Sequence, residues 1–420
     1  MNHFSYKEDT LSVEGQSLAE LAQNVPTPFY CYSSAALLEQ FDHYRKSFQK
    51  TNTLIAYAVK ANPRIALLRL LAQQGAGADI VSKGELMLCL DAHIHPQKII
   101  YSGVGKTQEE IDYALNHSIK SINVESLEEL DLICARAQAL QKQPSISFRI
   151  NPDIHAKTHP KTMTGTSATK FGLDIEKAKF AYNKAQQLKN IKIVGIAMHI
   201  GSQICEIEPF DKAFSSLKSF ITYLKEQNVS LNHVDIGGGL GFAYRQEEKT
   251  LSISDYAACA LDYFSSSGLE LVCEPGRSIA APSAVLVTRV LYNKKTPQKH
   301  FIIVDAAMND FMRPTLYESW HQVLPVHKNK SAAAIVDIVG PICETGDFLA
   351  KERALPPLRQ GDLLAIKDVG AYGSCLGNNY NSRLRAAEIL VHKGQIFTIR
   401  QRQTYENLLQ QDIIDNGLMG

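Results

Sequence analysis

The sequence predicts an α/β protein that combines a (β/α)8 TIM-type barrel with a C-terminal all-β domain resembling a Greek-key barrel. Between about residues 33 and 276, short apolar runs rich in β-branched residues alternate with longer helical segments. After residue 277, short β-rich runs follow one another without such helices. Parallel strands joined by crossover helices give the first pattern, and an all-β domain gives the second. We therefore expect residues 33–276 to form the barrel, and residues 1–32 and 277–420 to form a β-rich domain.

Eight near-continuously hydrophobic runs are the expected barrel strands, because a parallel sheet is covered on both faces. They are residues 54–60, 78–82, 98–102, 121–125, 145–151, 193–200, 233–237 and 269–274. The helices between them have recognisable starts. For example, Ser126 with Glu129 three residues later is typical of a capping box. Eight such units close naturally into a barrel.

The expected strands of the β-rich domain are residues 284–292, 301–305, 332–339, 362–369 and 387–400. The last range contains Lys393-Gly394-Gln395 between two apolar runs, which indicates a hairpin. Residues 28–32 have the composition of one more strand. Because that strand precedes the barrel, we expect roughly the first 30 residues to pair with the C-terminal domain.

The composition favours a protein that acts on a small molecule. The chain has 420 residues, of which 45% are hydrophobic, and its 44 Lys and Arg are spread along the chain against 43 Asp and Glu. No basic patch indicates a nucleic-acid partner, and no apolar run approaches the length that spans a membrane. The charged N-terminus does not resemble a signal peptide, so we expect a cytoplasmic protein. The cysteines lack C-x-x-C spacing, and His93, His95 and His155 lack ligand spacing, so no metal is expected.

Lys60 is the most informative residue, because it follows a buried apolar run that Asn62-Pro63 brings to an end. Active sites of (β/α)8 barrels lie at the carboxyl ends of the strands. An amine at this position could condense with a carbonyl cofactor as a Schiff-base lysine. A solvated lysine in a strand-to-helix turn is the commoner structure for a single lysine. The other strand ends decide between the two interpretations.

The other strand ends carry groups that suit a phosphorylated aromatic cofactor. Gly237, Gly238 and Gly239 would let backbone N–H groups approach a phosphate. Glu274 lies between Cys273 and Pro275, so burial of its carboxylate costs free energy unless it meets a protonated nitrogen or forms an ion pair with Arg277 or Arg149. His199 is either a flat ring stacked on a cofactor or a hydrogen-bonded core residue. An amine, a phosphate cradle, a carboxylate and a flat ring together match pyridoxal 5'-phosphate.

Four segments carry a resemblance to a known family. Residues 57–62, 199–203, 235–239 and 274–277 resemble the signatures of the alanine-racemase-type barrel decarboxylases, which are pyridoxal phosphate enzymes. The resemblance implies that the cofactor is bound by Lys60, Asp79, Arg149, His199, Ser202, Gly237, Gly238, Gly239, Glu274, Gly276, Arg277 and Tyr372.

Further segments resemble the branch of this superfamily that acts on diaminopimelate. They are residues 156–159 with 164–165 and 170–172, residues 313–317, residues 340–347, and residues 370–373 with 379–381. The resemblance implies decarboxylation of meso-2,6-diaminopimelate to L-lysine, with Lys60, His199 and Cys343 as catalytic residues and Cys343 as the proton donor. It implies that the β-rich domain contributes substrate-binding and catalytic residues, and that the substrate contacts Arg277, Arg313, Tyr317, Glu344 and Tyr372. In this family Cys343 and Glu344 come from the partner subunit, so a homodimer is expected.

Two arginines suit a substrate with a distal carboxylate, and they would reject amine-tailed substrates. A racemase, or a decarboxylase of ornithine or arginine, is the first alternative; Arg313 and the Cys343-Glu344 loop disfavour it. A regulator that binds the cofactor without turnover is the second, and the presence of Lys60 together with Cys343 and Glu344 disfavours it. Departures from the family pattern at Phe242, Thr345 and Leu384 remove no catalytic group but leave the pocket shape open.

Overall fold

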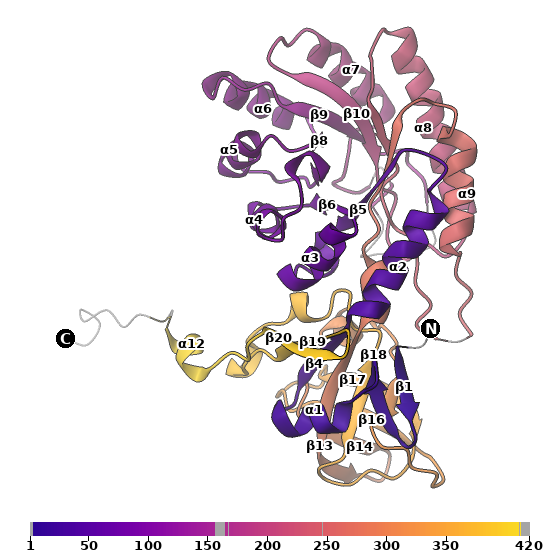
Figure 1. Ribbon diagram of the computed structural model, residues 1–420, viewed down its shortest axis with the longest axis vertical. Coiled ribbons are helices and arrows are strands. Elements are labelled where there is room, and N and C mark those ends of the chain that lie inside the picture. The colour runs from indigo at the N-terminus through magenta and orange to yellow at the C-terminus, as the bar shows by residue number, and fades with distance from the viewer. Residues whose placement is uncertain (1–2, 156–163, 167, 246, 411, 413–420) are drawn as a thin grey trace, which may run out of the picture. The chain divides into compact units, whose positions relative to one another are not determined.

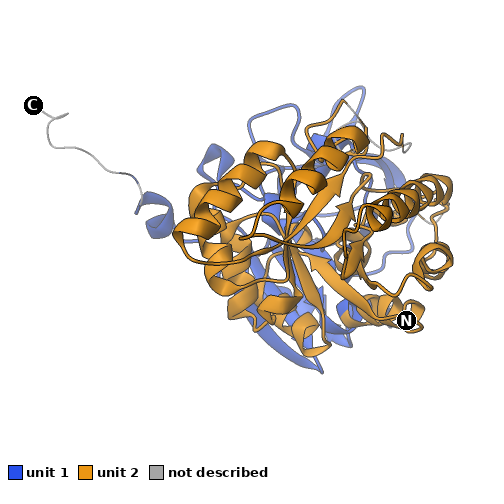
Figure 2. Cartoon of the chain, turned by 90° about the horizontal axis from the view of Figure 1, so that it is seen from above, with its two compact units in different colours: residues 1–37, 281–420 blue, residues 38–280 orange. Residues whose placement is uncertain are grey.

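The structure of the protein is a computed structural model that describes residues 3–155, 164–166, 168–245, 247–410 and 412. The chain divides into two compact units, shown in different colours in Figure 2. Unit 1 comprises residues 1–37 and 281–420, and unit 2 comprises residues 38–280. No helix in the described part of the chain is both long and apolar enough to cross a bilayer.

Unit 2 is a closed barrel of parallel strands, which confirms the predicted (β/α)8 fold (Figure 2). The strands follow one another around the barrel in the order β10-β11-β12-β5-β6-β7-β8-β9. Their bounds are Thr53–Ala58 (β5), Gly77–Ile80 (β6), Ile99–Tyr101 (β7), Ser121–Val124 (β8), Ser145–Ile150 (β9), Lys192–Met198 (β10), His233–Asp235 (β11) and Glu270–Cys273 (β12). Each strand ends one or two residues before the end expected from the sequence, because the last residues of each apolar run already belong to the loop that follows.

Among the described residues, helices lie outside the barrel strands; seven of them connect consecutive strands, one precedes β5 and one follows β12 (Figures 1 and 2). They are α2 (Ser34–Ser47), α3 (Ile65–Gln73), α4 (Lys83–Asp91), α5 (Gln108–His117), α6 (Leu127–Ala139), α7 (Ile175–Gln186), α8 (Glu208–Glu226), α9 (Ile253–Phe264) and the short α10 (Arg277–Ala280). Ser126 caps α6 by accepting from the Glu129 N–H at 3.1 Å, as expected. The Glu129 carboxylate instead accepts from the Glu125 N–H at 2.8 Å, so the reciprocal half of the expected capping box does not form.

Unit 1 is rich in β-structure, as expected, and its main sheet has nine strands. Their order is β17-β16-β14-β13-β4-β19-β20, with β18 paired to β13 and to β15. The sheet is mixed, because β4 is parallel to β19 and β14 is parallel to β16. The bounds are Phe29–Ser33 (β4), Ala284–Lys295 (β13), His300–Val304 (β14), Val323–Pro325 (β15), Ala334–Val339 (β16), Phe348–Leu355 (β17), Leu363–Lys367 (β18), Ala387–His392 (β19) and Gln395–Arg400 (β20).

The N-terminal segment supplies both strands and core to unit 1. β4 lies between β13 and β19, so residues 29–33 pair with strands more than 250 positions later in the chain. The small sheet of Phe4–Lys7 (β1), Thr10–Val13 (β2) and Gln16–Ser17 (β3) leads into Leu18–Asn24 (α1). Leu11, Phe29, Val287 and Ile389 belong to one buried cluster. Burial of this cluster holds the first and last parts of the chain together.

Two details of unit 1 test the sequence patterns. The expected hairpin is confirmed, because β19 and β20 pair from His392 to Gln395 around the two-residue turn Lys393-Gly394, in which both φ angles are positive. β17 was not predicted. Three charged residues, Lys351-Glu352-Arg353, interrupt its apolar sequence, so the strand lacks the alternation of apolar and polar residues that reveals a strand. Glu352 has a φ of 55°, and the pairing of β17 with β16 shifts register.

Candidate active site

Lys60 lies just beyond the carboxyl end of β5, in the 3-10 turn Val59–Ala61, rather than within the strand as expected. Its Nζ atom is 3.4 Å from Oδ2 of Asp79, the residue next to the end of β6. The Lys60 side chain is 36% exposed, whereas the Asp79 side chain is 1% exposed. The turn thus leaves the amine reachable from solvent while a buried carboxylate faces it.

Three buried carboxyl groups gather near this amine, from the ends of three barrel strands. Asp79 lies in β6, one residue before its end, Asp235 ends β11, and Glu274 comes directly after β12. Burial raises the pKa of Glu274 well above its usual range, and the negative charges of Asp235 and Asp79 raise it further, against the opposing effect of Lys60. Burial also raises the pKa of Asp235 to about 6. The acids therefore favour any cation or proton donor that enters among them.

Glu274 has the unsatisfied acceptor that a protonated ring nitrogen requires. Its Oε1 atom is buried and accepts no hydrogen bond from the described residues. The two arginines considered as ion-pair partners of Glu274 bind other groups. Arg149 Nη1 donates to Glu125 Oε1 at 2.9 Å, and Arg277 donates to the hydroxyl groups of Tyr244 and Ser202 at 3.1 and 3.0 Å. An orphaned buried carboxylate oxygen is rare in folded proteins and fits a ligand that carries an N–H.

His199 follows β10 and is held as a neutral ring. Its Nδ1 accepts the backbone N–H of Gly238 at 3.2 Å, which places the ring proton on Nε2. Burial lowers the pKa of His199 well below its usual range, and the positive charges of Lys60 and Arg149 lower it further. A neutral, flat imidazole in this position suits stacking against an aromatic cofactor.

The glycine turn after β11 brings backbone very close to neighbouring backbone. Gly237 has a φ of 67°, and a Cβ atom there would lie 2.3 Å from the Met198 carbonyl oxygen. A Cβ atom on Gly238 would lie 2.1 Å from the Glu274 carbonyl oxygen. No other residue type fits either position without movement of the backbone. The turn is therefore packed closely on its neighbours, and the N–H groups of Gly237 and Gly238 donate to Asp235 Oδ1 and His199 Nδ1. Ser202 and Arg277 add polar groups to this end of the barrel.

Arg149 is positioned by a residue that the sequence did not single out. Glu125, 5% exposed, accepts from Arg149 and also from the backbone N–H groups of Gly103 and Gly172, at 2.9 and 3.0 Å. The Arg149 guanidinium also lies over the Phe171 ring, 4.8 Å from its centre. One carboxylate thus fixes the arginine and two loops together. In the sequence, Glu125 was marked only by its place as an acidic residue at the end of an expected strand.

Residues of unit 1 form a second group. Arg313 and Tyr317 lie on the short helix α11 (Arg313–Tyr317), and Thr315 Oγ1 donates to the Gly346 carbonyl at 2.7 Å. The Cys343 N–H donates to Asn381 Oδ1 at 2.9 Å. The structure thus brings together three of the segments singled out from the sequence, residues 313–317, 340–347 and 379–381.

Cys343 is exposed, whereas Cys31, Cys89 and Cys273 are buried. Glu344, also exposed, forms a side-chain hydrogen bond with Tyr380 that raises the pKa of that tyrosine. Tyr372 has a φ of 55° in the loop between β18 and β19, a backbone conformation that is strained for a bulky residue. Strain of this kind is concentrated at functional positions.

The polar excursion after β9 is described in part. Residues 156–159 lie outside the described residues. Thr164 Oγ1 donates to the His199 carbonyl at 3.1 Å, and Gly165 packs so tightly on Ile200 that a Cβ atom there would lie 2.8 Å from the Ile200 Cα. This part of the excursion therefore borders the end of β10 at which His199 lies.

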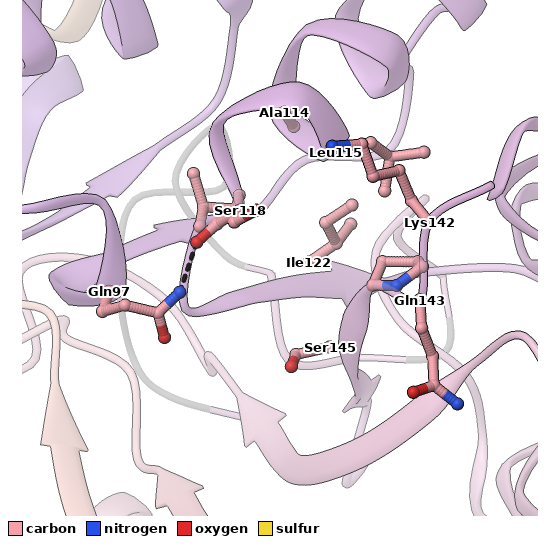
Figure 3. A pocket seen from close by; sticks show the side chains of 10 residues that line it. Gln97, Ala114, Leu115, Ser118, Ile122, Lys142, Gln143 and Ser145 are labelled. Carbon is pink, nitrogen blue, oxygen red and sulfur yellow. Dashed lines mark hydrogen bonds between the residues drawn. The ribbon is translucent and has the colours of Figure 1, made fainter. Parts of the chain in front are cut away.

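The opposite end of the barrel contains a separate pocket of about 160 Å³ (Figure 3). It lies near the first residues of β8 and β9 and is lined by Gln97, Leu115, Lys142 and Ser145, among others. The Gln97 amide donates to the Ser118 carbonyl at its rim (Figure 3). Because the amino ends of barrel strands contribute to stability rather than to chemistry, this pocket is not a candidate active site.

Comparison with known proteins identifies the family. Residues 34–281 match the family of the pyridoxal-dependent decarboxylases, pyridoxal binding domain. The diaminopimelate decarboxylases of Aquifex aeolicus and Pseudomonas aeruginosa are each 44% identical to this chain over 408 residues, which cover 97% of it and 97% and 98% of those proteins. The chain belongs to the diaminopimelate decarboxylase family.

Solved structures of the family agree with the fold described above. The crystal structure of the diaminopimelate decarboxylase from M. jannaschii in complex with L-lysine superimposes with a TM-score of 0.95 at 36% identity, over 99% of both chains. The diaminopimelate decarboxylase of Helicobacter pylori complexed with L-lysine has a TM-score of 0.91 at 41% identity and covers 93% of this chain and 98% of its own. The cofactor of the family, pyridoxal phosphate, fits this barrel, because Glu274 Oε1 is a buried acceptor that no described residue satisfies and the Lys60 amine is reachable from solvent.

Proposed function

We propose that the groups at the carboxyl ends of the barrel strands, with the substrate-binding segments of unit 1, carry out the family's reaction in this chain. That reaction is the pyridoxal phosphate-dependent decarboxylation of meso-2,6-diaminopimelate to L-lysine and CO2, the last step of lysine biosynthesis. The observation that carries the proposal is the solvent-reachable Lys60 amine beside the buried carboxyl groups of Asp79, Asp235 and Glu274.

The residues that would hold the cofactor divide by the part they bind. Lys60 would hold it covalently through Nζ, the glycine turn with Ser202, Gly276 and Arg277 would hold the phosphate, and His199 would lie against the ring. Asp79, Arg149 and Tyr372 complete the set. When bound, pyridoxal phosphate supplies an electron sink that accepts the electrons left behind as CO2 departs.

Glu274 holds the proton that this chemistry needs. The neighbouring acids raise the affinity of its carboxyl group for a proton, and a protonated nitrogen beside Oε1 would satisfy that oxygen. His199 stays neutral, so it adds no positive charge to repel that nitrogen. These side chains are arranged before any substrate arrives, which is the arrangement that electrostatic catalysis requires.

The distal end of the substrate selects diaminopimelate over simpler diamino acids. We assign its carboxylate to Arg277, Arg313 and Tyr317, and its ammonium group to Glu344, with Tyr372 completing the pocket. Ornithine and lysine lack the distal carboxylate and would leave arginine charges without their partner. We assign the proton that replaces CO2 to the exposed thiol of Cys343.

The test of Lys60 is covalent trapping. Borohydride reduction of the cofactor-loaded protein, followed by peptide mapping, is expected to find the cofactor mass on the peptide that contains Lys60. Lys60→Ala is expected to lose both that mass and the visible absorption of the bound cofactor. Lys98→Ala is a matched control, because the Lys98 Nζ donates to the Gly75 carbonyl oxygen on the barrel exterior, at 3.0 Å. A label on another lysine would contradict the assignment.

We also propose the domain roles, assembly and location that the family implies. Residues 33–276 would be the cofactor-binding domain, and residues 1–32 and 277–420 would contribute substrate-binding and catalytic residues. The protein would be a homodimer in which Cys343 and Glu344 complete the active site of the partner subunit. The free thiols of all eight cysteines fit a reducing compartment, and we place the enzyme in the cytoplasm. Cell fractionation tests that location.

Subunit complementation tests the shared site. Lys60→Ala and Cys343→Ala subunits, each inactive alone, are mixed under conditions that exchange subunits. If the two residues come from different subunits, half of the dimers are mixed and each has one intact site, so activity returns to about a quarter of the unsubstituted level. If both residues come from one subunit, no mixed dimer contains an intact site and activity stays absent. Light scattering measures the assembly itself.

A further inference from the structure

His321 is a fully buried histidine that links two elements of unit 1. It lies four residues after α11, with 0% of its surface exposed. Its Nδ1 atom is 2.8 Å from the Lys367 carbonyl oxygen at the end of β18, and its Nε2 atom is 3.2 Å from Arg313 Nη1. The Phe311 ring packs edge-on against it, with 4.7 Å between ring centres. The imidazole is therefore fixed on three sides.

The two hydrogen bonds determine the state of the ring. A carbonyl oxygen only accepts, so Nδ1 must donate to Lys367. A guanidinium only donates, so Nε2 must accept from Arg313. The ring is consequently neutral, with its single proton on Nδ1. A carboxylate at this position would also accept from Arg313, but it would neutralise the guanidinium, whereas an imidazole orients the arginine and preserves its charge.

We propose that His321 is a positioning residue that holds the Arg313 guanidinium in the orientation needed to bind the distal carboxylate of the substrate. The inference rests on the proposed role of Arg313 as a ligand of that carboxylate. Arg313 is 5% exposed, so a misdirected guanidinium there has little solvent to turn into. Forked recognition of a carboxylate depends on the plane of the guanidinium, and His321 Nε2 fixes one edge of that plane.

Two nearly isosteric variants separate the hydrogen bond from the packing. His321→Gln retains an acceptor that can reach Arg313, whereas His321→Met fills a similar volume without one. The distal carboxylate is remote from the carbon that loses CO2, so its binding affects KM more than kcat. We expect His321→Met to raise the KM for diaminopimelate about tenfold, as for loss of a hydrogen bond to a charged group, with kcat changed less than about threefold. His321→Gln should recover most of the KM.

Packing and the role of Arg313 need their own controls. Phe311→Leu removes the ring contact and keeps both hydrogen bonds, so we expect a lower melting temperature with an unchanged KM. Arg313→Lys tests the proposed function directly, and it should raise KM at least as much as His321→Met. In the Arg313→Lys background, His321→Met should add little, because the group that it positions has already been replaced.

The outcomes distinguish the two claims. If Arg313→Lys leaves KM unchanged, the assignment of Arg313 to the substrate is wrong, and the His321 inference fails with it. If Arg313→Lys raises KM but His321→Met does not, or if the Gln and Met variants are equally impaired, His321 has only a structural role. Should His321→Met fail to fold, His321→Phe, which keeps a ring against Phe311, replaces it in the same comparison.

Discussion

Asp235 should make the cofactor-free protein less stable as pH rises, and Asp235→Asn should remove that effect. Asp235 is fully buried at the end of β11, in contact with the carboxyl group of Glu274. Its oxygens accept from the Gly237 N–H at 2.9 Å and from the Asn123 amide at 3.3 Å. Asparagine can keep the first of these bonds, and a flipped Asn123, whose Oδ1 accepts nothing from the described residues, can supply the second.

The magnitude follows from the pKa of Asp235. Burial raises that pKa from about 3.8 to about 6, so the folded protein binds a proton that the unfolded chain releases. Stability contributed by the protonated form is therefore lost as pH rises through that window, and the full difference is about 3 kcal/mol above pH 7. About 1 kcal/mol of this is already lost at pH 4.5, which leaves about 2 kcal/mol between pH 4.5 and 7.5. Asp235→Asn should gain that amount relative to the unsubstituted protein.

The assay is thermal unfolding of both proteins, freed of cofactor, at several values between pH 4.5 and 8. For a unit of this size, 2 kcal/mol corresponds to a difference in melting temperature that grows by about 4–8 °C across the range and is level above pH 7. Asp91→Asn, an exposed acid on the same unit, is the control and should show no such growth. A difference that is constant with pH, or that shrinks as pH rises, would refute the reasoning.

Three further predictions concern other parts of the molecule. Gly238→Ala places a Cβ atom 2.1 Å from the Glu274 carbonyl oxygen, so we expect at least tenfold weaker cofactor binding by absorbance titration; unchanged affinity would be contrary to this account. Lys106→Met leaves the buried Glu129 carboxylate, 2.7 Å from Lys106 Nζ, without its cation, and the free energy of unfolding should fall by about 3–5 kcal/mol; a loss below about 1 kcal/mol in urea titrations would speak against it. Cys343→Ala should lower kcat by about 100-fold or more while the spectrum of the bound cofactor is unchanged, and an active variant would remove the thiol from its proposed role.

The barrel could be predicted because its physics is local to each strand. A strand buried on both faces must be apolar throughout, and eight such runs separated by capped helices have few other solutions. The predicted strands extend one or two residues beyond the observed ends for a related reason. Lys60 and Glu274 adjoin apolar runs, and hydrophobicity alone cannot show where the backbone leaves the ladder of hydrogen bonds.

Site residues could be predicted where one short segment contains the functional groups. They were missed where the function of a residue depends on partners far away in the sequence. Lys60 and the glycine turn stand out in the sequence. Glu125 and His321 do not, because their importance comes from partners such as Gly172 and Lys367, which are 47 and 46 positions away. Asp235 stood within a recognised motif, but its raised pKa arises from burial and from the negative charge of Asp79, which only the closed barrel brings near.

Turnover of a substrate panel tests the central claim most directly. Purified protein with pyridoxal phosphate is given meso-diaminopimelate, ornithine, lysine or arginine, while CO2 and the amino-acid product are measured. We expect CO2 and L-lysine in equal amounts from meso-diaminopimelate and no comparable release from the other three. Ornithine decarboxylated at a similar rate would contradict the account, because it has no distal carboxylate for Arg277 and Arg313 to bind.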